Sequence, residues 1–410
     1  MKILRGNAVV GQSGGPTAAI NATLSGVIRG ALRAKKNEVI NILYGMRNGI
    51  EGFLREDLVD LGEMFAEGKG LDILEQTPAA ALGSCRKKMK SPKDDPDTYA
   101  KLLEIFKKYD IRYFFYIGGN DSMDTVLKLS EYAKECDYEM RVVGVPKTID
   151  NDLAATDHTP GFGSAAKFVA TTMKELIRDT SVYTLDAVTI VEIMGRDAGW
   201  LTASAALTSI SGKECADLIY LPEKPFNKDV FLSSVKAALK KHPAVLVAVS
   251  EGIRYADGTY VGASGGQTDA FGHVRLSGAA KVLEWLVKDE IGCKVRSIEL
   301  NLPQRAAGHI LSRCDILESI GVGMGAVRCA TDGKTGIMMT INRREGEEYS
   351  SEVGYADISN IANAVRGVPD EYINDTADGI TEAGIKYLAP LIMGEIDVVF
   401  ENGLPKHIKI

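Results

Sequence analysis

Short, continuous apolar runs alternate along this chain with longer stretches of helical periodicity, and this alternation limits the fold more than any other feature. Runs without polar alternation are typical of parallel strands covered on both faces, so the pattern predicts an α/β protein. Seven strands are predicted, at Ala8–Val10, Val39–Tyr44, Tyr113–Ile117, Val142–Val145, Val188–Ile193, Ala244–Val249 and Gly336–Ile341. Helices are predicted between them, at Ala18–Lys35, Asp97–Tyr109, Met123–Cys136 and Ser164–Ile177.

Seven strands are more than we expect in a single sheet of one domain, so their number favours two α/β domains. A length of 410 residues agrees with this expectation, because ~150 residues per domain is usual. We expect the break just past the loop Thr148–Gly163, and a surface excursion at the polar, glycine-rich stretch Asp257–Gly272.

The balance of charge excludes several classes of partner. The chain has 48 Lys and Arg against 55 Asp and Glu, a formal net charge of −7. It therefore has no bulk attraction for nucleic acid or anionic lipid. We expect no nucleic-acid partner, and any bound phosphate has to be held by a local cluster of positive charge.

Cysteine usage and hydropathy favour a cytoplasmic protein. The six cysteines are scattered and include no C-x-x-C pair, which is typical of reduced thiols. The segment Met1–Gly6 lacks the apolar stretch of a signal peptide. The longest apolar runs, such as Ala244–Val249, are far shorter than the ~20 residues of a membrane helix. We expect no membrane association.

Three unusual loops follow predicted strands, at Gly11–Thr17, Gly118–Asp124 and Pro146–Asp152. Ligands collect at the carboxyl ends of strands in open α/β sheets. Glycines allow a phosphate to approach the backbone, and acids beside a lysine suit metal–phosphate chemistry. Each loop alone is also compatible with an ordinary turn or helix cap, but three such loops on one sheet favour a phosphate-handling site.

Two better-known phosphate-binding patterns do not apply. The pattern G-x-x-x-x-G-K-[ST] is absent, and the G-x-G-x-x-A match that starts at Gly161 follows a polar stretch rather than a strand.

His309 is predicted to be structural rather than catalytic.

Taken together, the motifs resemble those of the 6-phosphofructokinase family over roughly Val9 to Ile341. The matches are S-G-G with a downstream Asn, G-S-x-R followed by lysines, T-I-D-x-D, E-x-M-G-R, S-E-G and two late arginines. In this chain they are Ser13-Gly14-Gly15 with Asn21, Gly83-Ser84-Cys85-Arg86 with Lys87, Lys88 and Lys90, Thr148–Asp152, Glu192–Arg196, Ser250-Glu251-Gly252, Arg296 and Arg305.

This resemblance implies a phosphofructokinase-like α/β fold of two Rossmann-like three-layer domains, with the active site in the cleft between them. Residues 1–162 plus about 304–370 would form the phosphoryl-donor domain. Residues 163–303 plus about 371–410 would form the sugar-phosphate domain. The resemblance also implies a homodimer or homotetramer.

Two positions within the family are associated with the phosphoryl donor. ATP-using members carry G-G-D-G-S and P-G-T-I-D, whereas pyrophosphate-using members carry G-G-D-D-S and P-K-T-I-D. The matching residues here are Asp121 and Lys147, which implies the pyrophosphate-dependent type. The physics agrees, because an aspartate fills the space of the α-phosphate of a nucleotide and repels it, while a lysine grips a phosphate.

The resemblance also implies the roles of the site residues, with fructose 6-phosphate and pyrophosphate as substrates and Mg²⁺ as cofactor. Asp150 would be the general base that takes the proton of the fructose 1-hydroxyl, with Lys147 and Asp121 as further catalytic residues. Diphosphate would be bound by Gly15, Arg86 and Lys147. The sugar phosphate would be bound by Thr148, Ile149, Asp150, Asp152, Met194, Gly195, Arg196, Glu251, Arg296 and Arg305, and Mg²⁺ by Asn120 and Asp121.

The chain departs from the family pattern at three positions. The first acid of G-G-D is Asn120, which offers Mg²⁺ an oxygen without a charge. The bacterial ATP-type members have an arginine and a histidine where this chain has Ala187 and Leu302, so sugar-phosphate contacts are not predicted there.

Three alternatives stay open from the sequence. One is an ATP-dependent phosphofructokinase in which Asn120 alters the local electrostatics. Another is a NAD or lipid kinase with a G-G-D-G-type loop, which would leave Met194–Arg196 and the two late arginines unexplained. The third is a catalytically weak sugar-phosphate sensor.

Overall fold

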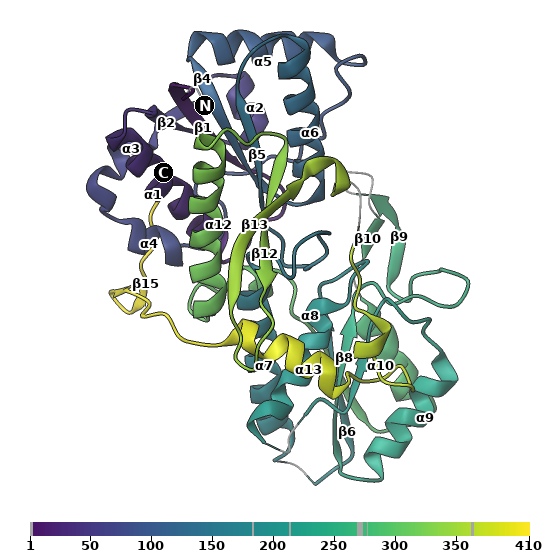
Figure 1. Cartoon of the computed structure of the whole chain (residues 1–410). Helices are drawn as coiled ribbons and strands as arrows, with labels where there is room; N and C mark the ends of the chain where they lie inside the picture. The colour runs from purple at the N-terminus through teal and green to yellow at the C-terminus, as the bar shows by residue number, and fades with distance from the viewer. Residues whose placement is uncertain (1–2, 183, 213–214, 269–273, 277, 362–364) are drawn as a thin grey trace.

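The computed structural model describes residues 3–182, 184–212, 215–268, 274–276, 278–361 and 365–410. These residues form two main β-sheets, each with helices on both faces, and the larger sheet lies in the upper half of Figure 1. The molecule is therefore built from two three-layer units, as an α/β chain of this length requires.

The larger sheet has seven strands, of which the five in the middle run parallel and the two at the edges run antiparallel to their neighbours. Their order across the sheet is β13 (Ser351–Asp357), β12 (Ile337–Arg343), β5 (Arg141–Pro146), β4 (Ile111–Gly118), β1 (Gly6–Gln12), β2 (Ile40–Met46) and β3 (Leu58–Asp60).

Each strand of this sheet supplies side chains to two separate cores, because successive residues point to opposite faces. In β1, Ala8 and Val10 belong to one core and Val9 to the other. The first core is covered by α1 (Ile20–Lys36), α3 (Leu61–Met64), α4 (Leu71–Gln76) and α12 (Arg313–Thr331), and the second by α2 (Gly49–Leu54), α5 (Pro96–Lys108) and α6 (Asn120–Glu135).

Helices α1 and α12 lie side by side (Figure 1) and touch through glycines. A β-carbon on Gly26 would come within 2.2 Å of the carbonyl oxygen of Ile320, and one on Gly323 within 2.2 Å of the carbonyl oxygen of Thr23. The two backbones are therefore in direct contact, which any larger side chain at these positions would prevent.

The smaller sheet has four parallel strands, in the order β11 (Lys294–Glu299), β6 (Ala187–Ile193), β8 (Ala244–Ser250) and β7 (Leu218–Tyr220). One face is covered by α7 (Phe162–Thr180), α8 (Trp200–Ala203), the 3₁₀ segment Ser204–Ser211 and α13 (Glu382–Leu388). The other face is covered by α9 (Lys228–Leu239) and α10 (Ala279–Glu290).

The remaining described elements are short. They are β9 (Ala263–Thr268), β10 (Val274–Leu276), α11 (Pro303–Ala306), β14 (Phe400–Glu401), β15 (Leu404–Pro405) and 3₁₀ turns at Ala66–Gly68, Ile358–Asn360, Asp370–Tyr372 and Ala389–Ile392. Residues 269–272 of the predicted surface excursion lie outside the described residues.

All seven predicted strands and all four predicted helices are confirmed, with ends displaced by a few residues. The sequence pattern does not predict β3, β7, β11, β13 or the helices α9, α10 and α12. Strands β11 and β13 lie at sheet edges and carry exposed residues along their length, so they lack the continuous apolar run that marks the central strands. The domain boundaries drawn from the resemblance stay a prediction.

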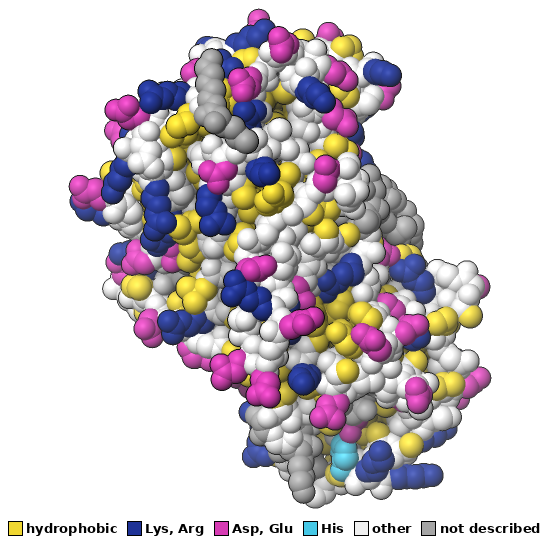
Figure 2. Space-filling view, viewed as in Figure 1, with side chains coloured by type: hydrophobic (Ala, Val, Ile, Leu, Met, Phe, Trp, Pro, Cys, Tyr) yellow, Lys and Arg dark blue, Asp and Glu magenta, His cyan; other side chains and the backbone are white. Residues whose placement is uncertain are grey.

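Acidic and basic side chains are interspersed over the face of the molecule shown in Figure 2. This mixed surface fits the absence of bulk attraction for polyanions expected from the net charge. Within the described part of the chain, no helix has both the length and the apolar character needed to cross a membrane.

Candidate active site

The three predicted loops start at one edge of the larger sheet. In the pairing of β1 with β4, Gln12 lies beside Ile117, and in the pairing of β4 with β5, Gly118 lies beside Pro146. Because these strands are parallel and in register, the loops that follow them emerge side by side. The pairing continues into the third loop, where the Lys147 backbone N–H donates to the Gly118 carbonyl at 3.0 Å.

Lys147 places a buried ammonium group between these loops. Its side chain is only 2% exposed, and Nζ donates to the Gly15 carbonyl oxygen at 2.6 Å. Burial lowers the pKa of Lys147 to about 8, against the opposing charge of Asp150. The positive charge on which the site depends is therefore poised to titrate just above neutral pH.

The segment after Lys147 carries two acids in a tight turn. The backbone N–H of Asp150 donates to Thr148 Oγ1 at 3.0 Å, and that hydroxyl lies 3.4 Å from Asp150 Oδ2. Burial raises the pKa of Asp150, while Lys147 and the Thr148 hydroxyl oppose the shift. Burial and the charge of Asp150 raise the pKa of Asp152 to about 7. Acids with raised pKa values are suited to accept a proton near neutral pH.

The loop after β4 meets this turn on one side and a lysine-rich segment on the other. Asn120 Nδ2 donates to Asp152 Oδ2 at 3.4 Å. The neighbouring Asp121 points to Lys88, whose Nζ lies 3.3 Å from Asp121 Oδ1. The two donor-associated residues, Asp121 and Lys147, therefore belong to adjacent loops with separate partners.

Arg86 lies in a segment that is bonded to the glycine loop. The Ser84 hydroxyl donates to the Gly14 carbonyl at 2.7 Å, and the Gly14 N–H donates to the Cys85 carbonyl at 3.2 Å. Besides burial, the positive charge of Arg86 lowers the pKa of both Lys147 and Arg305. Three cations thus act on one another at the end of the larger sheet.

The ends of β6 and β8 in the smaller sheet supply a second group of predicted residues. The Gly195 N–H donates to Glu251 Oε1 at 3.4 Å, and the Ser250 hydroxyl donates to the Gly195 carbonyl at 2.5 Å. Gly195 has a φ of +136°, and a β-carbon there would lie 2.5 Å from the Ala198 carbonyl oxygen. Burial and then the nearby charge of Asp150 raise the pKa of Glu251 to about 7.

Arg305 joins the two groups. It lies in α11, which follows the smaller sheet, and its Nη1 would be 3.3 Å from a β-carbon on Gly15 of the larger sheet. The preceding Gln304 is buried, and its Oε1 accepts a hydrogen bond from the Met194 N–H at 3.1 Å. The short helix is therefore fixed against the end of β6 while its arginine reaches the glycine loop.

A family model described as phosphofructokinase matches residues 7–330. The chain belongs to the phosphofructokinase family. The matched range includes every residue assigned to the site above.

Several relatives of this phosphofructokinase are similar over almost the whole length. Proteins named pyrophosphate–fructose 6-phosphate 1-phosphotransferase from Xanthomonas campestris and Halomonas elongata are 42% and 41% identical, over 99% and 98% of this chain and 96% of each relative. A crystal structure of pyrophosphate-dependent phosphofructokinase from Nitrosospira multiformis superposes with a TM-score of 0.89 at 38% identity and covers 99% of this chain and 96% of that one. The predicted phosphofructokinase-like α/β fold is confirmed.

Two residues predicted to bind the sugar do not direct their side chains to the rest of the phosphofructokinase site. Arg296 is exposed in the middle of the edge strand β11, beside Thr189 of β6, rather than at the carboxyl end of the sheet. The Ile149 side chain is packed in the core of the smaller sheet, so its backbone is the part left to contact a ligand. Both roles stay predictions.

The residues around Asn120 fit a magnesium ion that is shared with phosphate. Asn120 Oδ1 is buried and has no hydrogen-bond partner in the described structure, and the Asp152 carboxylate lies beside the same amide. Among the described residues, no three His, Cys, Asp or Glu side chains are grouped to hold a metal ion by themselves. Mg²⁺ commonly binds through one or two protein oxygens together with substrate phosphates, and this arrangement provides such oxygens.

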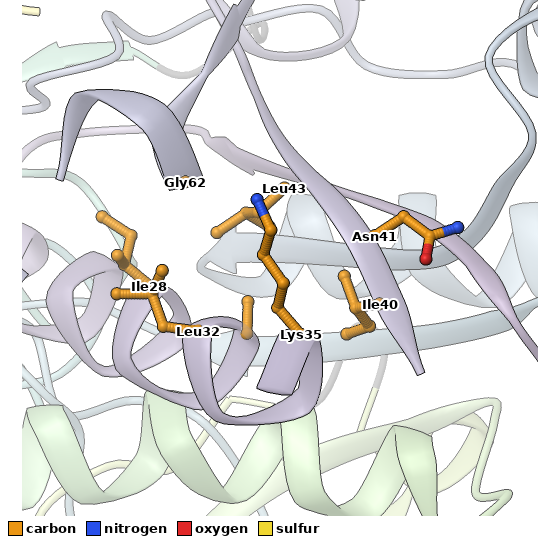
Figure 3. A pocket seen from close by; sticks show the side chains of 8 residues that line it. Ile28, Leu32, Lys35, Ile40, Asn41, Leu43 and Gly62 are labelled. Atoms are coloured by element: carbon orange, nitrogen blue, oxygen red, sulfur yellow. The ribbon is translucent and has the colours of Figure 1, made fainter. Parts of the chain in front are cut away.

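A small apolar groove between α1 and β2 lies outside the phosphofructokinase site (Figure 3). It is lined by Ile28, Leu32, Lys35, Ile40, Asn41 and Leu43, with Ala31 and Gly62. None of the predicted site residues contributes to it, so the groove plays no part in the chemistry of the site.

His158, which lies behind the T-I-D-N-D turn, is not among the residues predicted from the sequence. It is almost completely buried between two carboxylates, Asp157 and Glu318. A histidine next to an aspartate in a loop is a weak signal, and Glu318 is too distant in sequence to be recognised as its partner.

Proposed function

We propose that this protein is a pyrophosphate-dependent 6-phosphofructokinase. It transfers a phosphoryl group from pyrophosphate to the 1-hydroxyl of fructose 6-phosphate and yields fructose 1,6-bisphosphate and phosphate. The observation that carries this proposal is the buried Lys147 ammonium, 2.6 Å from the Gly15 carbonyl oxygen, with Asp121 on the adjacent loop. The names of the relatives that are about 40% identical support the same donor.

Pyrophosphate is favoured over ATP by charge and by space. Lys147 Nζ occupies the junction of the glycine loop and the T-I-D-N-D turn, where it neutralises a phosphate that has no nucleoside attached. The Asp121 carboxylate lies at the first turn of α6 and would repel the α-phosphate of a nucleotide. A donor that ends at its second phosphate avoids this repulsion.

Asp150 is the general base of the proposed reaction. The residue is half-buried and desolvation raises its pKa, so the group accepts the proton of the attacking 1-hydroxyl more readily than an ordinary aspartate would. Thr148 Oγ1 fixes the turn by accepting from the Asp150 N–H. Asp152, with its pKa near 7, supports the base in the same turn.

The transferring phosphoryl group is held by cations and a backbone donor. Lys147, Arg86 and the Gly15 N–H stabilise the charge on the equatorial oxygens, which is the main way a protein accelerates phosphoryl transfer. Asn120, Asp121 and Asp152 are the residues that would hold Mg²⁺, which would supply positive charge to neutralise the diphosphate.

The sugar phosphate lies against the smaller sheet in this proposal. Gly195 is fixed by the Glu251 carboxylate and the Ser250 hydroxyl, and Gly195 and Glu251 line the sugar with Met194 and Arg196. Arg305 and Arg296 would clamp the 6-phosphate. The assembly as a homodimer or homotetramer and the cytoplasmic location also remain proposals.

A donor-exchange assay tests the function. Purified protein is incubated with fructose 6-phosphate and Mg²⁺, and fructose 1,6-bisphosphate is measured with pyrophosphate or with ATP. We expect turnover with pyrophosphate, little with ATP, and a reverse reaction from fructose 1,6-bisphosphate and phosphate. Turnover with ATP alone would instead establish an ATP-dependent enzyme, and sugar-phosphate binding without turnover would establish a sensor.

A further inference from the structure

The turn that carries Asp150 is held in place by the segment that follows it. We call residues 148–152 the reacting limb and residues 156–160 the return limb. The Thr159 N–H donates to Asn151 Oδ1 at 3.0 Å, and the Thr159 hydroxyl donates to the Thr148 carbonyl at 2.8 Å. The Thr148 N–H donates to the Pro160 carbonyl at 3.2 Å. The position of the reacting limb is therefore set by that of the return limb.

The return limb has several anchors, among them the bond from the Asp157 N–H to the Ile341 carbonyl and those from Arg366 to the Thr156 and Asp157 carbonyls, and the His158 side chain adds a charged one. This side chain is 2% exposed, with Nδ1 2.8 Å from Asp157 Oδ1 and Nε2 2.7 Å from Glu318 Oε2. Both ring nitrogens face carboxylate oxygens, so the imidazolium form, which donates from both, satisfies both contacts. Burial alone would lower the pKa of His158, but the hydrogen bonds to Asp157 and Glu318 outweigh burial and raise it to about 9.

The two carboxylates that bond His158 also accept hydrogen bonds from other residues. Glu318 lies in α12, and its Oε1 accepts from the Tyr349 hydroxyl at 2.6 Å and the Ser351 hydroxyl at 2.5 Å. Asp157 Oδ1 also accepts from Arg343 Nε at 3.2 Å. Each carboxylate is thus held by at least one other element, which makes the clamp a rigid connection between the return limb and helix α12.

Lys147 is fixed independently of this clamp. Its backbone N–H bonds to the Gly118 carbonyl and its ammonium to the Gly15 carbonyl. Gly118 ends β4 and Gly15 lies in the loop after β1, so neither partner belongs to the return limb. A change at His158 is therefore expected to move Asp150 while leaving the donor-binding lysine in place.

We propose that His158, clamped between Asp157 and Glu318, is a positioning residue that holds Asp150 in line for the transfer step. Its ring nitrogens bond to Asp157 and Glu318, neither of which is assigned to the substrates, so it acts through the return limb and not as an acid or base in the reaction. This inference rests on the proposed function.

The test is His158→Gln, which removes the charge and leaves a side chain that can donate to one carboxylate only. Because displacements of about 1 Å can cost ~10²-fold in rate, we expect kcat to fall between about 10- and 100-fold. We expect KM for pyrophosphate to change by less than about twofold, since Lys147 keeps both partners. Glu318→Gln, which keeps the side-chain shape, should shift kcat in the same direction, and it tests the proposal if His158→Gln does not fold.

Two controls separate positioning from general stability. His242, on the smaller sheet side, also bonds an aspartate, with Nε2 2.7 Å from Asp217 Oδ1, and His242→Gln should leave kcat unchanged. Val235→Ala in α9 empties part of a buried core and lowers the melting temperature without touching the loop. At a temperature well below every transition, Val235→Ala should retain kcat while His158→Gln does not.

The outcomes distinguish this inference from the proposed function. If the unmodified protein does not use pyrophosphate, the proposed function fails. If it does and either clamp variant folds with an unchanged kcat, or with kcat and the pyrophosphate KM altered equally, the positioning role is overturned. A loss of kcat that Val235→Ala matches at the same temperature would also overturn it.

Discussion

At the end of the larger sheet the site residues form a group of charges that act on one another, whereas at the end of the smaller sheet a single carboxylate is held against the main chain. Lys147 is buried, Asp150 and Asp152 are half-buried beside it, and each of the three has a shifted pKa. Gly195 has a positive φ, and its N–H donates to the Glu251 carboxylate. In the proposed function, this difference corresponds to a larger sheet whose residues stabilise developing charge and a smaller sheet whose residues line the sugar.

Removal of the proposed base is expected to have the largest effect on catalysis. Asp150→Asn keeps the size of the side chain but cannot take the proton, and general-base catalysis typically contributes ~10²–10⁴-fold. We expect kcat to fall by at least about that factor in steady-state assays with saturating substrates. Near-normal turnover would remove Asp150 from this role and the larger sheet from the chemical step.

Loss of the buried cation is expected to have the next largest effect. Lys147→Met keeps the apolar stem but removes the charge that faces the diphosphate, and deleting one such group typically costs ~10²–10³-fold in kcat. We expect kcat to fall and KM for pyrophosphate to rise, with KM for the sugar little changed. An isolated rise in the sugar KM would contradict the assignment of Lys147 to the donor.

Two arginines that follow or lie in the smaller sheet test its assignment to the sugar phosphate. Arg305 is partly buried beside Gly15, and charged hydrogen bonds contribute about 1.5–3 kcal/mol, so Arg305→Gln should raise the sugar-phosphate KM by roughly 10- to 100-fold. Arg296 is exposed along β11, and Arg296→Gln should raise this KM by less. An equal rise in this KM for both variants would contradict the position of Arg296 away from the carboxyl end of the smaller sheet.

The pH dependence of kcat/KM for pyrophosphate should report the buried charges directly. Asp152, with a pKa of about 7, becomes protonated as pH falls below that value. Lys147, with a pKa of about 8, becomes neutral as pH rises above it. We expect a narrow optimum between these values and about a tenfold loss per pH unit beyond each limb. Because the pKa of Asp150 is raised as well, Asp152→Asn should displace the acidic limb rather than abolish it, and an unchanged profile in this variant would contradict a contribution from Asp152.

The central strands are predictable from the sequence because both faces of each are buried. β4 reads Tyr113-Phe-Phe-Tyr-Ile117, and every one of these side chains is almost fully buried. Helix α12 is not predicted for the opposite reason, since glycines such as Gly321, Gly323 and Gly325 disfavour a helix in isolation. Gly323 is needed because the backbone of α12 touches that of α1 there, and Gly325 because the side chains of Val353 and Met339 in β13 and β12 lie against it.

The loop motifs predict which residues gather at the site but not what holds them. Lys147 and Gly15 could be brought together from the order of parallel strands alone. The clamp on His158 depends on Glu318 and Tyr349, which reach it from a late helix and from the segment between β12 and β13. Local patterns do not encode such contacts, because they follow from the packing of distant elements.

The contact between α1 and α12 also has a consequence for how the chain folds during synthesis. Helix α1 leaves the ribosome early, but residues 313–331 that cover its glycine face follow only after the whole smaller sheet. Pairings between such distant segments are slow and leave apolar surface open in the meantime. The larger sheet is therefore the first to begin folding and the last to be completed. The face of α1 that α12 covers stays exposed until residues 313–331 have been synthesised.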